Sequence, residues 1–244
     1  MSHKPKIVAH RGGASLNPEN TLTAFRHAIA LGVDEVECDV HLLKSGEVVI
    51  FHDFKLEQLT GKNGDIADID NATRKALKIR GSDEAPSLLS ELLELLASTN
   101  VRLHLEIKTR GEKEKELLLA NEALRLVEQY NMVGQTSAIS FDGDCLKPFI
   151  EAGIPSGPCI DNIDILKDDM THHFEVWKKC GFKDLSLNAS KTSVSFVEAA
   201  LNAGFIVGVW TVNGPARLSH WLSIPVSYIT TDQPDLALKL RNKL

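Results

Sequence analysis

The chain has 244 residues and a formal net charge of −6, with 43% hydrophobic and 25% charged residues. These values are those of an ordinary globular protein, and the acidic balance argues against a nucleic-acid binder, which usually carries a basic face. No stretch approaches the roughly 18 apolar residues of a membrane span, and the first residues contain no apolar signal segment. We therefore expect a soluble, cytoplasmic protein without a stable membrane anchor.

Strand-like apolar runs alternate along the chain with amphipathic helical patterns. The helical patterns cover residues 21–31, 88–97, 113–130, 193–203 and 234–244. Eight strand-like runs lie at residues 7–10, 35–40, 102–107, 136–140, 155–160, 184–188, 206–211 and 226–230. The alternation predicts parallel strands joined by helical crossovers, and eight such units predict a closed (β/α)₈ TIM barrel.

An open doubly wound sheet is the alternative fold, but no G-x-G-x-x-G turn follows the first run. Since α/β barrels of about this length are commonly one domain, we expect a single domain over residues 1–244.

A ninth strand-like run, residues 47–51, follows the second run after only the short link 42–46, which is too short for a parallel crossover. We expect it to double back as a β-hairpin over the C-terminal mouth, with its turn near Ser45 and with His52 roughly opposite Asp39. The polar, glycine-containing segment 54–86 is expected to form a small irregular insertion over the same mouth.

Three carboxylates are predicted to converge at the C-terminal ends of two strands. Strand periodicity places Glu37 and Asp39 on one face with Cys38 on the other, and Glu106 lies near the end of the next barrel strand. Three acids pointing into a barrel repel one another, so we infer a divalent cation, and oxygen-only ligands favour Mg²⁺ or Ca²⁺. An ion-pair network with neighbouring basic residues is the alternative.

Two histidines are expected at the same rim, His10 at the end of the first strand and His52 at the end of the hairpin. Two imidazoles beside a carboxylate cluster are suited to move protons during P–O cleavage near neutral pH. His41 and His104 share a strand face with the carboxylates, so either could support the site without touching the substrate.

Positive and aromatic side chains complete the expected site. Arg11 offers a planar fork for phosphate oxygens and Lys108 a point charge, although both could instead balance the acids. Glu19 could support Arg11 or the cation. Trp210 ends the seventh barrel strand, where its ring either packs in the core or forms a wall for a glycerol moiety.

The order of these motifs resembles the glycerophosphodiester phosphodiesterase family over nearly the whole chain. The matching residues are His-Arg-Gly at 10–12, Pro-Glu-Asn-Thr at 18–21, Glu-x-Asp at 37–39, His-Asp at 52–53, Pro-x-Leu at 86–88, Glu-Ile-Lys at 106–108, Trp-Thr-Val-Asn at 210–213 and Ile-Thr-Thr-Asp-Gln-Pro-Asp at 229–235.

The resemblance implies a barrel fold, a divalent cation and hydrolysis of glycerophosphodiesters to glycerol 3-phosphate and an alcohol. In this resemblance His10 and His52 match the acid/base pair, the three carboxylates the metal ligands, and Arg11 and Lys108 the phosphate contacts. The resemblance also points to attack by the glycerol 2-hydroxyl, giving a cyclic phosphate that water then opens. Gln58 departs from the family pattern, which commonly has arginine there, and this affects a possible ion pair at the rim.

Two rival functions remain open. A related lipid phosphodiesterase, such as a lysophospholipase D, would need an apolar approach to a membrane or micelle. A non-catalytic binder of glycerophosphodiesters would be expected to lack a histidine or a metal ligand, and none is missing here. The expected partner is a small-molecule glycerophosphodiester, with no nucleic acid, and the chain is expected to be a monomer or homodimer.

Overall fold

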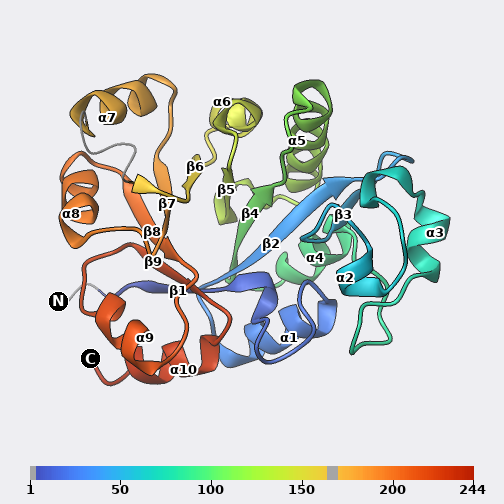
Figure 1. Ribbon diagram of the computed structural model, residues 1–244, viewed down its shortest axis with the longest axis horizontal. Helices are drawn as coiled ribbons and strands as arrows, with labels where there is room; N and C mark the ends of the chain where they lie inside the picture. The colour runs from blue at the N-terminus through green and yellow to red at the C-terminus, as the bar shows by residue number, and fades with distance from the viewer. Residues whose placement is uncertain (1–3, 164–169) are drawn as a thin grey trace.

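Parallel strands close into a barrel at the centre of the molecule (Figure 1). The computed structural model describes residues 4–163 and 170–244. Within them the barrel strands are β1 (Lys6–Ala9), β2 (Glu35–Leu42), β4 (Arg102–Ile107), β5 (Thr136–Ser140), β6 (Ser156–Ile160), β7 (Asp184–Asn188), β8 (Ile206–Trp210) and β9 (Tyr228–Thr231). Because β1 pairs with both β2 and β9, the sheet has no open end, and the predicted TIM barrel is confirmed.

Helices form the crossovers that surround the barrel (Figure 1). They are α1 (Leu22–Leu31), α4 (Leu89–Leu96), α5 (Lys113–Gln129), α6 (Lys147–Glu151), α7 (Met170–Lys179), α8 (Val194–Asn202), α9 (Pro215–Leu222) and α10 (Pro234–Arg241). Local chemistry sets some of their starts: the Thr21 side chain caps α1 by accepting from Ala24 N, and proline opens α9 and α10. The main hydrophobic core lies between these helices and the outward faces of the strands.

Strand β2 shows how periodicity separates this core from the barrel interior. Val36, Cys38 and Val40 are fully buried in the helix-facing core. Glu37 and Asp39, on the opposite face, are buried inside the barrel. Because successive strand residues point to opposite sides, the same strand supplies both packing and chemistry, as the sequence predicted.

The predicted hairpin is confirmed by β3 (Val48–Ile50), which pairs antiparallel with the end of β2. Phe51 N donates to Asp39 O, so His52 lies within one residue of its predicted position. The following segment carries α2 (Glu57–Thr60), the 3₁₀ turn η2 (Ile66–Asp68) and α3 (Asn71–Ala76). It packs on a second hydrophobic cluster formed by Leu43, Val49, Phe51, Leu56, Ile66, Leu77 and Ile79. The division into a single domain with this insertion stays a prediction.

One local expectation was wrong. β1 ends at Ala9, and His10 begins a 3₁₀ turn, η1 (His10–Gly12), so strand alternation does not orient its side chain. In the described part of the chain, no helix has the length and apolar character needed to cross a membrane.

Candidate active site

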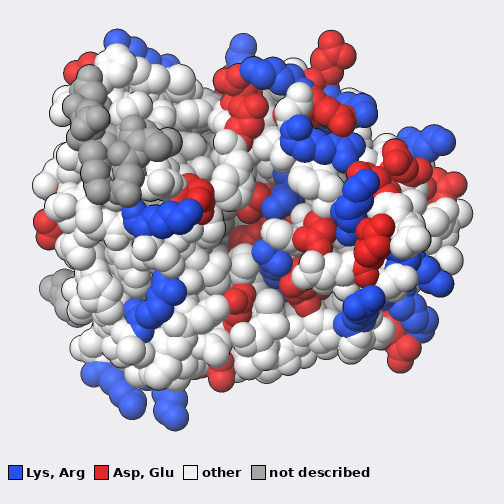
Figure 2. Space-filling view, in the orientation of Figure 1, with Lys and Arg blue, Asp and Glu red and all other residues white. Residues whose placement is uncertain are grey.

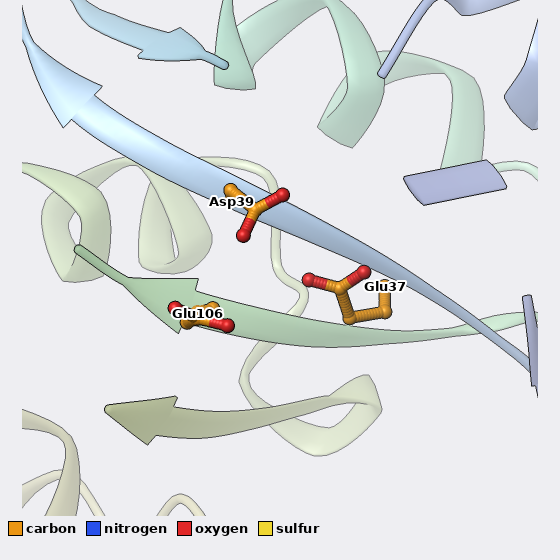
Figure 3. Close-up of side chains that lie close together, drawn as sticks. All are labelled: Glu37, Asp39 and Glu106. Carbon is orange, nitrogen blue, oxygen red and sulfur yellow. The ribbon is translucent and has the colours of Figure 1, made fainter. Parts of the chain in front are cut away.

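Glu37, Asp39 and Glu106 meet at the C-terminal ends of β2 and β4 (Figure 3). The parallel register sets Asp39 opposite Glu106 and Glu37 opposite His104. One carboxylate oxygen from each of the three acids lies within 4.8 Å of the other two. The structure therefore brings the predicted acids together over one point inside the barrel rim.

Two basic side chains lie beside this cluster and neutralise part of it. Lys108 Nζ is 2.8 Å from Glu106 Oε1 and 3.3 Å from Asp39 Oδ1, and Arg11 Nε is 3.4 Å from Asp39 Oδ2. Burial opposes ionisation of Asp39, but these two charges outweigh it and lower the pKa of that carboxyl. The ion-pair alternative considered from sequence is thus present in the structure, centred on Asp39.

Glu37 differs from the other two acids because no lysine or arginine side chain in the described residues forms an ion pair with it. Its Oε2 accepts from the backbone N–H of Arg11, while Oε1 is buried and has no hydrogen-bond partner. Burial, reinforced by the charge of Asp39, raises the pKa of Glu37 to about 8. An unpartnered carboxylate oxygen beside two other carboxylates fits a hard divalent cation that prefers oxygen ligands.

The Pro-Glu-Asn-Thr segment at residues 18–21, which directly precedes α1, supports the carboxylate cluster. Arg11 donates to Glu19 Oε1 at 2.9 Å, which is one of the two roles considered for Glu19 from the sequence. Asn20 is buried, has a positive φ of 58°, and donates from Nδ2 to Asp39 Oδ2 at 3.0 Å. The η1 turn fits closely against α1, since a Cβ on Gly12 would lie 2.8 Å from that of Ala24. Glycine is therefore required after His10-Arg11.

His10 is held by a carboxylate from the far end of the chain. Its Nδ1 lies 2.6 Å from Asp232 Oδ1, and Asp232 also accepts from Asn213 Nδ2. Burial acts to lower the pKa of His10, but the Asp232 hydrogen bond and the Glu37 charge outweigh it, so the pKa is raised. Since a carboxylate accepts from Nδ1, the Nε2 atom, 4.0 Å from Glu37, is left to exchange protons in the cavity.

His52 has the same type of support on the opposite wall. Its Nδ1 lies 2.6 Å from Oδ1 of the adjacent Asp53. Its backbone carbonyl lies 3.2 Å from His41 Nε2, and burial lowers the pKa of His41 to about 4, so this imidazole is neutral and donates the bond. His41 therefore anchors the hairpin end that carries His52.

A cavity of about 110 Å³ joins these groups, and Figure 2 shows the hollow near the centre of this face with acidic and basic side chains in it. The cavity is lined by the charged residues His10, Arg11, Glu37, His52, Glu106 and Lys108 and by the aromatic residues Trp210 and Phe141. Trp210 is only half-buried and contacts Phe141 edge-to-face, with ring centroids 5.8 Å apart. The ring thus lines the cavity and is not buried in the core. His104 also lines it, and burial lowers the pKa of its imidazole to about 4.

Sequence reasoning assigned no role to Asp53, Asp232 or Asn20. Asp53 and Asp232 belong to the His-Asp and Ile-Thr-Thr-Asp motifs of the family resemblance. The carboxylate in each motif was the signal that could have indicated a partner for a histidine. Asn20 lies directly before the helix cap Thr21, and its side chain donates to Asp39.

A sequence model of the glycerophosphoryl diester phosphodiesterase family matches residues 10–236. A glycerophosphodiester phosphodiesterase of Bacillus altitudinis is 29% identical over 259 residues, covering 98% of this chain and 99% of that protein. A human lysophospholipase D is 32% identical over 138 residues, covering 52% of this chain and only 42% of that relative.

A solved structure shows the same fold. A phosphodiesterase of Oleispira antarctica, determined in complex with its product sn-glycerol 3-phosphate, matches with a TM-score of 0.85 at 23% identity, covering 98% of this chain and 97% of that one. The family match extends from His10 to beyond Asp232, so it includes every residue placed in the site above. The chain therefore belongs to the glycerophosphoryl diester phosphodiesterase family.

Proposed function

We propose that the protein hydrolyses glycerophosphodiesters to glycerol 3-phosphate and an alcohol, with one divalent cation as cofactor. One observation carries the proposal: two imidazoles, each held by a carboxylate, line the same cavity as Glu37 and Glu106, two of the three converging acids. This set supplies proton transfer, charge neutralisation and cation binding in one place. The family membership and the activities named for the relatives support it.

Glu37, Asp39 and Glu106 would hold the cation, Mg²⁺ or Ca²⁺. When bound, it supplies positive charge that polarises the phosphoryl oxygens. Lys108 and Arg11 now balance Asp39 and Glu106. With the acids neutralised, these side chains are available to the substrate phosphate, as a point charge and a planar fork.

The two histidines move the protons. One imidazole removes the proton from the attacking hydroxyl, and the other protonates the leaving alkoxide; each transfer is typically worth about 10²–10⁴-fold in rate. Asp232 and Asp53 fix the two rings through Nδ1, and Asp232 also stabilises the protonated form of His10. The histidines exchange roles in the second step, in which water opens the cyclic phosphate formed in the first step.

The nucleophile of the first step is the substrate's own 2-hydroxyl, which forms a cyclic phosphate. Cys159, Ser186 and Thr211 line the cavity, but in the described residues none is hydrogen-bonded to His10 or His52. Burial raises the pKa of Cys159 well above its usual value, so its thiolate is scarce. A tethered hydroxyl has an effective molarity that can reach about 10⁵ M or more.

One assay tests the proposal. The pure protein is incubated with glycerophosphocholine, glycerophosphoethanolamine or glycerophosphoglycerol, with Mg²⁺, Ca²⁺ or EDTA, and glycerol 3-phosphate is measured. We expect turnover with a cation, none after chelation, and loss of turnover in Glu106→Gln. Full activity after exhaustive chelation, with metal analysis showing none bound, would refute the role of the cation.

The rival functions give different results in the same assay. The human relative is named a lysophospholipase D. An enzyme of that kind would release the head-group alcohol from lysophosphatidylcholine faster than from glycerophosphocholine. A non-catalytic binder would bind glycerophosphocholine without releasing product. The cytoplasmic location and the monomeric or homodimeric state stay predictions from the sequence.

A further inference from the structure

A buried histidine deep in the active-site cavity has an unused hydrogen-bonding atom. His104 lies on β4, is 1% exposed and lines the cavity. Its Nδ1 lies 2.7 Å from Ser137 Oγ, whereas its Nε2 is buried and has no hydrogen-bond partner in the part of the chain that the structure describes. Because a buried polar atom without a partner costs free energy, His104 Nε2 is available to a ligand that enters the cavity.

The inward face of β4 arranges three polar side chains by depth. Lys108 directly follows the strand at the mouth, Glu106 lies near its C-terminal end, His104 lies two residues before Glu106, and all three line the cavity. Alternate strand residues share a face, and two residues of a strand span about 6.6 Å, so His104 lies deeper in the barrel than Glu106. A ligand with its phosphate near Lys108 can therefore extend past the carboxylates to His104.

The opposite wall of the barrel carries a second buried donor without a partner. Trp210 ends β8, which lies across the barrel from β4, with β5, β6 and β7 between them on one side and β2, β1 and β9 on the other. The Nε1 atom of Trp210 is buried and has no hydrogen-bond partner among the described residues. The cavity has a volume of about 110 Å³, so a small polar ligand in it lies between these two walls.

The surroundings of His104 favour a hydroxyl as its partner. Burial lowers the pKa of the imidazole to about 4, so the ring is neutral and has one donor and one acceptor nitrogen. The Ser137 hydroxyl can match either form of Nδ1, which leaves Nε2 as an acceptor or a donor. A ligand hydroxyl fits both forms because it donates and accepts, whereas an anion is disfavoured by Glu35 Oε2, 4.0 Å from His104 Nδ1.

We infer that His104 binds the terminal hydroxyl of the substrate's glycerol and determines specificity for that group. The inference rests on the proposed function for the position of the phosphate. In this arrangement the phosphate lies by Lys108, the 2-hydroxyl lies at the level of Glu106, and the terminal hydroxyl reaches His104 Nε2, with the Trp210 ring on the opposite wall. The enzyme then rejects diesters in which the glycerol is replaced by an alcohol without the terminal hydroxyl.

Two substrates that differ in one hydroxyl test this inference. Glycerophosphoethanol has both glycerol hydroxyls, whereas the ethyl phosphodiester of propane-1,2-diol keeps the 2-hydroxyl and has a methyl group in place of the terminal one. Wild type, His104→Leu, His104→Gln and Tyr228→Phe are compared, after thermal unfolding has shown which variants are folded. Tyr228→Phe is the control, because the Tyr228 ring packs on His104 with centroids 4.8 Å apart, while its hydroxyl donates to Asp184 and does not line the cavity.

We expect the kcat/KM of wild type to be at least roughly tenfold higher for glycerophosphoethanol than for the propanediol diester, whose methyl group leaves His104 Nε2 without a partner. His104→Leu should abolish this preference by lowering kcat/KM for glycerophosphoethanol alone. His104→Gln, whose amide also donates and accepts, should keep part of the preference, and Tyr228→Phe should keep all of it. Equal values for the two substrates in wild type, or a loss in His104→Leu that is equal for both, would overturn the inference.

A binding measurement separates this inference from the proposed function and needs no variant of His104. Glycerol 3-phosphate and 2-hydroxypropyl phosphate are titrated into wild type with Ca²⁺, by calorimetry and by NMR of the His104 Nε2 resonance. A shift of that resonance with glycerol 3-phosphate alone, and at least roughly tenfold tighter binding of it, support the inference even if no diester is hydrolysed. Hydrolysis of glycerophosphoethanol with equal binding of the two phosphates would refute the role of His104 and leave the proposed function standing.

Discussion

Glu37 provides the sharpest test of the site, because its environment predicts that cation binding expels a proton. The side chain is buried and has no lysine or arginine partner in the described residues, and burial together with the charge of Asp39 raises its pKa from 4.5 to about 8. A carboxyl whose pKa is raised in this way takes up a proton at a higher pH than an ordinary carboxyl and loses it as the pH rises further. Because a cation requires the carboxylate, binding near neutral pH should release protons, and the release should fall at higher pH.

Isothermal titration of Mg²⁺ or Ca²⁺ into metal-free protein measures this release when it is repeated in buffers that differ in ionisation enthalpy. The slope of binding enthalpy against buffer ionisation enthalpy should show proton release at pH 7 and fall toward zero as the pH rises to about 9. Glu37→Gln should lose most of the release. A binding enthalpy that does not depend on the buffer at pH 7 would refute the reasoning.

The same proton predicts how the metal-free protein responds to pH. The folded-state pKa of Glu37 lies above its ordinary value, so folding stability is lost as pH rises from about 4.5 to about 8. At 1.36 kcal/mol per pH unit, the loss between about pH 5.5 and pH 8 is about 3 kcal/mol.

Urea unfolding in EDTA should show this loss in wild type and in the exposed control Glu128→Gln, but not in Glu37→Gln. Parallel pH dependence in wild type and Glu37→Gln would show that another group holds the proton.

Three further predictions concern the proposed chemistry. His10→Ala and His52→Ala, if folded, should each lower kcat at least roughly tenfold, and a variant that keeps more than about a tenth of wild-type kcat would give its histidine a structural role. Asp232→Asn removes the negative charge of the carboxylate that accepts from His10 and helps to raise its pKa, so that pKa should fall in NMR titration, and an unchanged value would contradict the assignment. A substrate analogue without the 2-hydroxyl should bind but barely turn over, and brisk hydrolysis would show that water attacks first.

The sequence by itself determined the strands and the direction of the carboxylates. The observed strands Arg102–Ile107, Thr136–Ser140 and Asp184–Asn188 agree with the predicted ranges to the residue. Alternation with a period of two is a local property, so Glu37 and Asp39 could be placed on one face before any fold was known. The short link before β3 likewise required a hairpin, which placed His52 at the mouth.

Only the tertiary structure decided which of these groups touch. Asp232 lies 222 positions after His10, and it becomes a partner because closure of the barrel pairs β1 with β9 and sets Ala9 opposite Thr231. The Asn20 contact with Asp39 depends on a left-handed backbone conformation at Asn20, after η1. Contacts of this kind arise from strand register and barrel closure, and the local pattern of residues does not specify either of them.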